Sequence, residues 1–393
     1  MTPPEHVESL PELTDNPDHP VAELVEGPRT PLEDLDTPRL LVDVSRLESN
    51  IARTAADLAA ANVQVRPHMK TSKCLEVFAR QRAAGAIGFT CATPAEVRLL
   101  GEAGHTGIVW AHQAVGRAKV EFAVNAAENW GVTLIADSLA VATPISDLAA
   151  ERGVTVTMLM EVDAGQHRTG VAVDSDEATA LATALAALPN VTFGGILTHE
   201  GHLGPMRGRD VLEATGRSVG EAMAALAERI RATGLACEIV SVGSTPGLSS
   251  APYAAGVTEA RPGTYVYFDA NQIRAGSCTI DACALTVLSR VVSVRPGQVI
   301  IDAGLKAMSA DALTPENGGG IVCDLDAVPL PGVQFPVANE EHGFLTGAVD
   351  HLKVGDLVRI VPNHACGTVN MWSKLTALFD DGRREIWPIE ARH

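Results

Sequence analysis

Short β-rich apolar runs alternate with Ala/Leu-rich stretches of helical period from about residue 45 to about residue 270. This alternation is typical of βα units, which place parallel strands in one sheet and helices outside it. Eight such runs can be counted, and eight parallel strands close a (β/α)8 TIM barrel. A doubly wound open sheet is the alternative. The runs are QVRPH at 64–68, IGFTCAT at 87–93, GIVWAHQ at 107–113, VTLIADS at 132–138, VTMLMEVDAG at 156–165, FGGILTHEGH at 193–202, EIVSVGS at 238–244 and TYVYFD at 264–269.

The barrel pattern occupies only the middle of the chain, so three parts are predicted. Residues 37–275 form the barrel. Residues 276–393 contain strand-like runs separated by turn residues and no convincing helical period, which predicts a mostly antiparallel β domain. Residues 1–36 carry ten carboxylates, seven prolines and one base, Arg29, a composition typical of an acidic extension that resists regular structure.

Composition narrows the classes of function. The formal net charge is −18, and no cluster of Lys and Arg offers the phosphate contacts that nucleic-acid binding needs. No run approaches the roughly 20 apolar residues of a membrane span, and the first residues have neither the basic segment nor the apolar segment of a signal peptide. The seven cysteines form no CxxC pair and are odd in number, which fits a reducing compartment. We therefore expect a cytoplasmic protein without membrane or nucleic-acid partners.

Polar side chains gather where the expected strands end. In a barrel enzyme the chemistry lies at the carboxyl ends of the strands, whereas the opposite ends here are mostly Gly, Ala and Val. A purely structural barrel has no reason to collect ionisable groups at one rim, so this asymmetry predicts an active site there. The residues concerned are His68, Lys70, His112, Gln113, Asp137, Asp163, Arg168, His199, His202 and the tripeptide Gly243-Ser244-Thr245.

Two of these features suggest a phosphorylated cofactor. Glycine at position 243 lets the backbone approach an anion, and the hydroxyls of Ser244 and Thr245 can donate to it, although a plain turn has the same residues. Lys70 is either a surface lysine or an imine-forming lysine that attaches such a cofactor. Lys73, three residues further on, is expected to be a solvated helix residue.

A second candidate site is the run Pro362-Asn363-His364-Ala365-Cys366. On a strand, His364 and Cys366 point to the same face, so both can hold one metal ion. A ring nitrogen with a thiolate suits zinc. Two ligands at this spacing also occur by chance.

In their order along the chain, these motifs resemble the D-serine dehydratase and D-threonine aldolase family, which are fold-type III pyridoxal phosphate enzymes related to alanine racemase. The resemblance covers nearly everything after residue 36. It rests on TP at 37–38 with LLVDVSRLESNIARTA at 40–55, RPHMKT at 66–71, DAG at 163–165, RTG at 168–170, HEGH at 199–202, VGSTP at 242–246, RPGTY at 261–265, DAG at 302–304, EHG at 341–343 and PNHAC at 362–366.

The resemblance implies the cofactor, its contacts, a metal and a homodimer. Lys70 would carry pyridoxal 5'-phosphate as an internal aldimine, with Arg168 and Tyr267 beside the cofactor. A divalent metal would lie next to the substrate hydroxyl. The implied phosphate contacts are Gly243, Ser244 and Thr245, and the implied metal ligands are His364 and Cys366.

The resemblance implies a lyase acting on D-3-hydroxy amino acids, with the metal polarising the 3-hydroxyl. If a base takes the α-carbon proton and the hydroxyl leaves, the products are a 2-oxo acid and ammonia, as in a dehydratase. If a base takes the hydroxyl proton, the products are glycine and an aldehyde, as in an aldolase. Lys70, His199 and His202 are the candidate bases. We expect His68 and His112 to pack around the site.

The metal motif favours a D-serine dehydratase. Members resembling the dehydratase have His-x-Cys and Gly-Ser-Thr-Pro, as here, whereas the better-known aldolases have His-x-Asp and Gly-Gly-Gly-Thr. The thiolate makes zinc the expected metal, while an aspartate would suit manganese or magnesium. However, NMW at 370–372 resembles aldolases as much as dehydratases, so the aldolase stays the alternative.

Two further readings are less favoured. A racemase would take its second base from a tyrosine of the β domain, but all three tyrosines, at 253, 265 and 267, precede that domain. A non-catalytic carrier of pyridoxal phosphate would share the barrel and Lys70, yet it would not need a β domain with His364 and Cys366.

Overall fold

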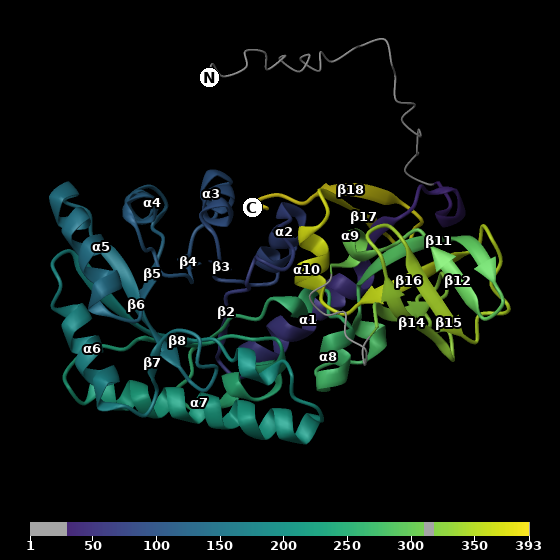
Figure 1. The fold of residues 1–393 in the computed structure, drawn as a ribbon. Coiled ribbons are helices and arrows are strands. Elements are labelled where there is room, and N and C mark those ends of the chain that lie inside the picture. Colours follow the sequence, from purple (N-terminus) through teal and green to yellow (C-terminus); the bar gives the residue numbers. More distant parts are fainter. Residues whose placement is uncertain (1–29, 310–317, 393) are drawn as a thin grey trace, which may run out of the picture.

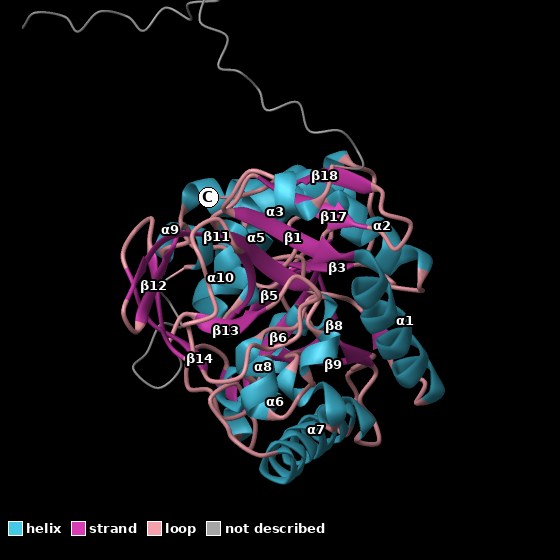
Figure 2. Ribbon diagram, turned by 90° about the vertical axis from the view of Figure 1, so that its right-hand side faces the viewer, coloured by secondary structure: helices cyan, strands magenta, loops and turns pink. Residues whose placement is uncertain are grey.

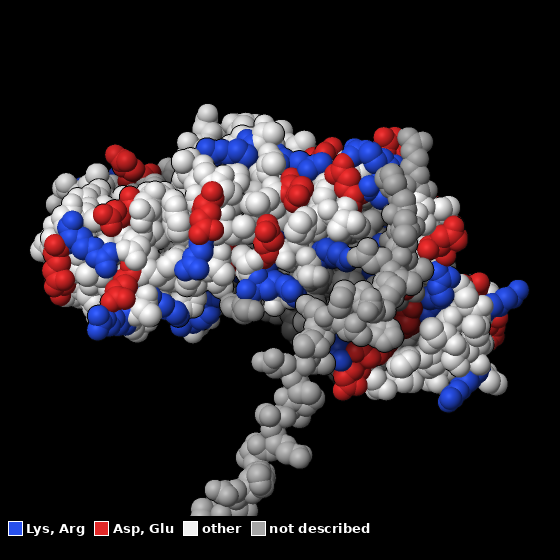
Figure 3. All heavy atoms as spheres, turned by 90° about the horizontal axis from the view of Figure 1, so that it is seen from above, with Lys and Arg blue, Asp and Glu red and all other residues white. Residues whose placement is uncertain are grey.

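The computed structural model describes residues 30–309 and 318–392, which form an α/β barrel and a β domain lying beside it (Figure 1). Within these residues, no helix is long and apolar enough to cross a membrane. On the face drawn in Figure 3, acidic and basic side chains are interspersed over both parts of the molecule.

Eight parallel strands close the barrel, as the alternation predicted. Backbone pairing runs from β2 through β10, β9, β8 and β6 to β5, and β3 pairs with β4. Single bridges between His68 and Thr90 and between Val109 and Thr133 join these two groups into a ring. The strands are β2 (Gln64–Val65), β3 (Phe89–Cys91), β4 (Ile108–Trp110), β5 (Leu134–Ala136), β6 (Val156–Asp163), β8 (Val191–Thr198), β9 (Ile239–Val242) and β10 (Glu259–Ala260), and the short β7 (Val171–Ala172) adds to β6.

Helices cover the outside of the ring because each buries one apolar face against the strands. Met158 and Val240 of the strands pack with Ile145 and Met223 of the helices, all fully buried, and burial of each such side chain contributes about 1.5–3 kcal/mol. The helices are α1 (Val44–Ala60), α2 (Leu75–Ala83), α3 (Pro94–Glu102), α4 (Arg117–Trp130), α5 (Leu139–Arg152), α6 (Asp176–Ala186), α7 (Arg209–Arg231) and, at the boundary with the β domain, α8 (Ala270–Ala275).

The prediction of the eighth barrel strand was wrong. The run at 264–269 forms a 3-10 turn, η5 (Thr264–Val266), followed by α8, and the eighth strand is the earlier β10. The run is apolar because Tyr265 and Tyr267 are fully buried in the core that underlies the β domain, not because the chain is paired there. The side chain of Asp269 accepts from the Gln272 amide at 2.9 Å and so begins α8.

The β domain is a nine-stranded, mostly antiparallel sheet, as predicted. Its strand order is β14-β15-β12-β11-β1-β17-β18, and β16 pairs with β11 and β13. The elements are β11 (Leu285–Arg295), β12 (Gln298–Ile301), α9 (Leu305–Met308), β13 (Gly320–Cys323), β14 (Val333–Ala338), β15 (Gly343–Gly347), β16 (Leu357–Pro362), α10 (Ala365–Asn370), β17 (Lys374–Leu378) and β18 (Arg384–Pro388).

One segment assigned to the barrel lies in this sheet instead. Strand β1 (Arg39–Asp43) pairs antiparallel with β11 and parallel with β17. Figure 2, seen from the β-domain side, shows β1 beside β17 and β11. Leu40 and Leu41 are fully buried in the sheet's packing, which anchors β1 in the β domain.

The predicted acidic extension lies mainly outside the described residues. Of residues 1–36, only 30–36 are described. These residues dock on the β domain, where Leu35 is buried and the Arg290 guanidinium donates to the carbonyl oxygens of Glu33 and Leu35 at 2.9 and 3.3 Å.

Candidate active site

Two adjoining cavities, each of about 370 Å³, open at the carboxyl ends of the barrel strands. The barrel cavity is lined by barrel residues alone, whereas the boundary cavity is lined by both domains. Both contain Lys70, and both also contain His68, His199 and Arg261. The further lining of the barrel cavity includes Thr90, His112, Gln113, Glu161 and Arg168, and that of the boundary cavity includes Ser244, Thr245, Thr264, Asp269, His364 and Cys366.

Lys70 lies in a loop that the barrel holds in place. The Met69 amide donates to the Thr90 carbonyl at 2.9 Å, and the Lys70 amide donates to Nδ1 of His68 at 3.3 Å. Burial and then the charge of Lys70 lower the pKa of His68 well below its usual value, so this ring is neutral and accepts from the loop. His68 thus lines both cavities rather than only packing around them.

His199 follows β8 and is a neutral imidazole. Its Nδ1 lies 2.6 Å from the carbonyl oxygen of Gly243, and since a carbonyl only accepts, Nδ1 carries the hydrogen and Nε2 keeps its lone pair. Burial, and then the charge of Lys70, lower the pKa of His199 to about 3. The ring can therefore take up a proton only through Nε2.

His202 lies outside the lining of both cavities. It belongs to the turn η2 (Gly201–Leu203), and its ring faces Gly165 so closely that an added Cβ there would lie 3.3 Å from Nε2. Its Nδ1 has no hydrogen-bond partner among the described residues. Lys70 and His199 therefore line the same cavities, whereas the His202 ring packs against Gly165 outside their lining.

The loop after β9 has the form of an anion cradle. Ser244 Oγ accepts from the Gly247 amide at 2.9 Å, and Thr245 Oγ1 accepts from the Tyr265 amide at 3.1 Å. A Cβ at Gly243 would lie 2.8 Å from the Arg261 guanidinium, and one at Gly263 would lie 2.8 Å from Thr71 Oγ1. Positions 243 and 263 therefore have room for glycine alone. The hydroxyls of Ser244 and Thr245 line the cavity that also contains Lys70, so the residues present fit a phosphorylated cofactor.

Arg261 was assigned no role from the sequence. Its guanidinium is buried and donates to Ser241 Oγ and to the Thr198 carbonyl. Behind it, Glu259 accepts from Ser241 Oγ at 2.7 Å and from Arg66 at 2.8 Å. Burial lowers the pKa of Arg261. The nearby carboxylates of Glu259 and Glu200 raise this pKa but only partly offset the effect of burial. The signal was available, because RPG at 261–263 is one of the resembling motifs.

Glu161 was also missed, although a charged residue within the apolar run VTMLMEVD marks it. Its Oε1 accepts from Thr169 Oγ1 at 3.0 Å and lies 3.9 Å from the guanidinium of Arg168. Gln113 donates to its other oxygen and, at 3.3 Å, to Asp137. Burial raises the pKa of Glu161. The half-exposed Arg168 therefore reaches the barrel cavity beside a buried carboxylate.

We had expected the metal motif to lie on a strand, but the structure places it elsewhere. Strand β16 ends at Pro362, His364 is the N-cap of α10, and Cys366 lies in the first turn of that helix. Both side chains nevertheless line the boundary cavity. Asp269, which the sequence analysis did not single out, accepts from the Ala365 amide at 2.9 Å and so ties α10 to the barrel. Burial raises the pKa of Asp269 to about 6.

The Cys366 thiol has surroundings that favour the thiolate. Its Sγ lies 3.1 Å from Thr71 Oγ1 and 3.6 Å from Thr264 Oγ1. Burial raises its pKa, but the hydrogen bond and charge of His364, with the charge of Lys70, outweigh burial and leave the pKa lowered. A thiolate beside an imidazole is a donor pair for a soft or borderline divalent metal.

Comparison with known proteins agrees with this geometry. The model of "Alanine racemase, N-terminal domain" matches residues 42–271, and that of "Putative serine dehydratase domain" matches residues 284–378. D-threo-3-hydroxyaspartate dehydratase from Delftia sp. is 36% identical over 90% of this chain and 97% of its own. Its solved structure has a TM-score of 0.86 and covers 91% of this chain and 98% of the other.

The chain belongs to this family of fold-type III pyridoxal phosphate-dependent lyases. D-threonine aldolase from Arthrobacter sp. is 31% identical over 93% of this chain and 95% of its own, and D-serine dehydratase from Dictyostelium discoideum is 24% identical over 90% and 95%. A further solved structure is of a cysteine-to-alanine mutant of D-threo-3-hydroxyaspartate dehydratase in the metal-free form.

Tyr267, which we had placed beside the cofactor of this lyase, does not reach either cavity. Its side chain is fully buried in the core that contains Cys74 and Val77. Its hydroxyl has no hydrogen-bond partner among the described residues, and burial raises its pKa well above the usual value. The turn that replaces the expected eighth strand points it away from the site.

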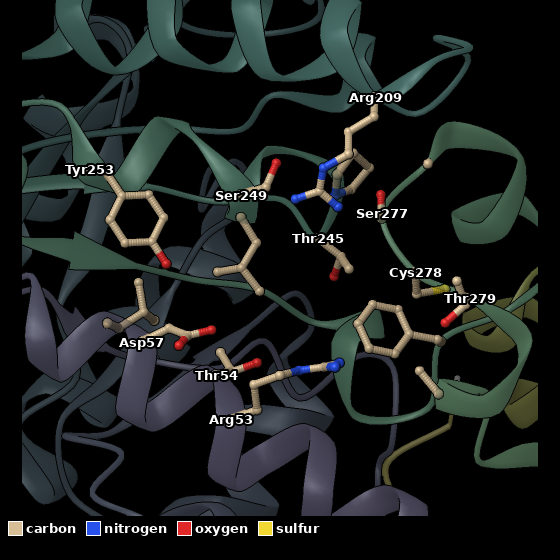
Figure 4. A pocket seen from close by; sticks show the side chains of 16 residues that line it. Arg53, Thr54, Asp57, Arg209, Thr245, Ser249, Tyr253, Ser277, Cys278 and Thr279 are labelled. Carbon is tan, nitrogen blue, oxygen red and sulfur yellow. The ribbon is translucent and has the colours of Figure 1, made fainter.

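A larger cavity of about 670 Å³ lies on the other side of Thr245, between α1 and the start of α7 (Figure 4). Arg53 and Arg209 extend into it from these two helices, and Tyr253 and Asp57 lie at one end. Of the site residues predicted for the lyase, it contains only Thr245. We therefore place the chemistry in the two cavities that share Lys70.

Proposed function

We propose that this lyase is a metal-dependent dehydratase of the D-serine type, which converts a D-3-hydroxy amino acid to a 2-oxo acid and ammonia. One observation carries the proposal: a lysine, an anion cradle and a His–Cys pair line a single cavity. The relatives support the substrate class, since those compared act on D-threo-3-hydroxyaspartate, D-threonine and D-serine.

Pyridoxal phosphate, when bound, supplies an electron sink for charge that develops on the substrate's α-carbon. In this proposal the Lys70 amine attaches the cofactor, and Gly243, Ser244 and Thr245 bind its phosphate through hydroxyl and amide hydrogens. The same amine, when it is not attached to the cofactor, would be placed to take the α-carbon proton. His199, with its free Nε2, is the second candidate base, and His202 stays a weaker one because it lies outside the lining of both cavities.

A divalent metal, zinc first and manganese or magnesium as alternatives, would be held by His364 and Cys366. There it would act as a Lewis acid on the substrate's 3-hydroxyl. The lowered pKa of Cys366 supports a thiolate ligand, and the metal-free form of a cysteine mutant of D-threo-3-hydroxyaspartate dehydratase points the same way.

The alternative is an aldolase that cleaves the bond between the α- and β-carbons to give glycine and an aldehyde. In this reaction the base removes the proton of the substrate's 3-hydroxyl rather than the proton on its α-carbon. The Arthrobacter relative is a D-threonine aldolase, which keeps this reaction open. The Cys366 ligand and the higher identity to a dehydratase favour elimination.

Product analysis separates the two reactions. The holoenzyme is incubated with D-serine, D-threonine and D-threo-3-hydroxyaspartate in turn, and oxo acid, ammonia, glycine and aldehyde are assayed, with Lys70→Ala as the blank. Equal amounts of oxo acid and ammonia are expected. Glycine with an aldehyde and no ammonia would overturn the dehydratase in favour of the aldolase. Ammonia is the deciding product, because cleavage of D-threo-3-hydroxyaspartate would give glyoxylate, an aldehyde that is also a 2-oxo acid.

We also propose a homodimer in the cytoplasm. The family resemblance supports the dimer, and the free thiols of all seven cysteines, which lie within the described residues, support a reducing compartment. Light scattering coupled to size exclusion measures the mass, and a monomer at micromolar concentration would contradict the dimer.

A further inference from the structure

We propose that Lys73 and the C-terminal segment, residues 389–392, are positioning elements that fix the loop carrying Lys70. This inference rests on the proposed role of Lys70 in attaching the cofactor. It concerns residues that the catalytic proposal does not use, and one of them, Lys73, was expected to be solvated.

Lys73 is instead only 4% exposed. Its Nζ lies 2.6 Å from Glu96 Oε1, on the buried first turn of α3, and donates to the Ala391 carbonyl at 2.9 Å. Its own carbonyl accepts from the Glu390 amide at 2.8 Å. The main chain and the side chain of one residue thus hold the same tail at two successive positions.

The contacts continue from Lys73 to the site. The Lys73 amide donates to the Met69 carbonyl at 2.9 Å, so residues 69–73 close one turn that contains Lys70 and Thr71. Lys73 has a φ of 47°, a left-handed conformation that a residue with a Cβ keeps only where its surroundings impose it. Glu96 is fixed in turn, because its second oxygen accepts from the Ala92 amide at 2.6 Å.

The segment that makes these contacts belongs to the other domain. It follows β18, and the Ile389 amide donates to the Ser373 carbonyl at 2.8 Å while its side chain is buried. From the same loop, Thr71 contacts the Cys366 thiol at 3.1 Å. The loop is therefore held to the β domain at two points that follow Lys70, at Thr71 and at Lys73, which fixes the amine relative to the metal motif.

A buried ion pair is not in itself a strong source of stability, because the desolvation of both charges offsets their attraction. Its directional contacts, however, select one geometry. We therefore assign the Lys73–Glu96 pair and the tail to positioning, which predicts effects on cofactor retention and kcat that exceed the effect on thermal unfolding.

Two truncations test this assignment. Deletion of residues 390–393 removes the Glu390 amide and the Ala391 carbonyl, whereas deletion of residue 393 alone keeps both and places the new C-terminal carboxylate on the exposed Arg392. In holoenzyme, the longer deletion is expected to speed loss of the cofactor's visible band to a cofactor trap about tenfold, the effect of losing two hydrogen bonds. It should lower kcat more than it changes KM, and speed amide exchange at 69–74. The shorter deletion should match wild type.

Equal cofactor loss, kcat and amide exchange in the two truncations would overturn the assignment. If the longer deletion does not fold, Glu390→Pro and Glu390→Ala decide, since only the proline removes the amide that donates to Lys73. Faster cofactor loss in the proline variant alone supports the inference, and equal rates in both overturn it. Failure of the proposed role of Lys70 looks different, because wild type itself would then lack a band that borohydride reduces.

Discussion

The two cavities that share Lys70 differ in what builds their walls. The barrel cavity is made by the ends of successive strands, whereas the boundary cavity also requires α10 and the turn before α8. Lys70, His199, Arg261 and the anion cradle all come from the barrel, and the His–Cys pair alone comes from the β domain. Under the proposed function, cofactor attachment and hydroxyl activation therefore have separate structural sources, so mutations should be able to separate them.

The largest effect is expected at Lys70, where the cavities meet. Lys70→Ala should remove the visible band of lysine-bound cofactor and lower turnover by about 10³-fold or more, because both attachment and proton transfer lose their amine. Absorbance before and after borohydride, with product assays, measures this. Lys119→Ala, an exposed lysine on α4, is the matched control. A normal band in the Lys70 variant would contradict the assignment.

A substitution in the β-domain wall should affect only one of the two functions. Cys366→Ala should lower turnover by about 100-fold or more, since a metal ligand is lost, and should leave the cofactor band in place. Metal content by mass spectrometry accompanies the assay. Cys278→Ala, a partly buried thiol in the larger cavity behind Thr245, is the control. Full activity of the Cys366 variant after verified loss of metal would break the separation.

His199 belongs to both walls, and its neutrality gives a pH dependence. Because its folded pKa, about 3, lies below the usual 6.5, the unfolded chain binds the proton first and stability falls as pH falls through this interval. Between pH 6.5 and pH 5 the loss should be about 2 kcal/mol. His199→Asn should flatten the curve by that amount in denaturant unfolding of the cofactor-free protein. If the stability curves of wild type and the His199→Asn variant run parallel with pH, the His199 ring takes up its proton as readily in the folded state as in the unfolded state, which would contradict the neutral assignment.

The smallest effect is expected in the cradle. Ser244→Ala removes one donor to the cofactor phosphate, about 1 kcal/mol or roughly a fivefold weaker cofactor Kd. Titration of the cofactor-free protein with pyridoxal phosphate measures it. Ser249→Ala, an exposed serine five residues further along, should leave the Kd unchanged. If both variants bind equally well, the phosphate lies elsewhere.

The sequence revealed the site residues at the strand ends more fully than the contacts between distant segments, for a physical reason. Strand ends follow a repeating local pattern, so Lys70, His199 and Ser244 could be placed at one rim without knowing any contact. Lys73 could not be placed, because its partners Glu96 and Ala391 are distant in sequence and only packing brings them together.

Two local predictions failed in an instructive way. The aromatic run at 264–269 reads as a strand, but it is apolar because the β-domain core surrounds it. The spacing of His364 and Cys366 predicted a shared face on a strand, and the two do face one cavity, although a helix start produces the arrangement. The alternation of apolar residues and the spacing of polar ones do not show which residues of the other domain pack against a segment. At the domain boundary, this packing decides the local structure.

The position of β1 has a consequence for how the protein is made. Leu41 near the start of the described residues pairs with Thr376 close to their end, so this central strand of the β sheet lacks one neighbour until residue 376 has left the ribosome. Pairings so distant in sequence form late, because the intervening chain must be ordered first. The barrel with Lys70 is synthesised before that happens. Under the proposed function, the half that contains Lys70 and the anion cradle would thus be ordered before the sheet that supports His364 and Cys366 is complete.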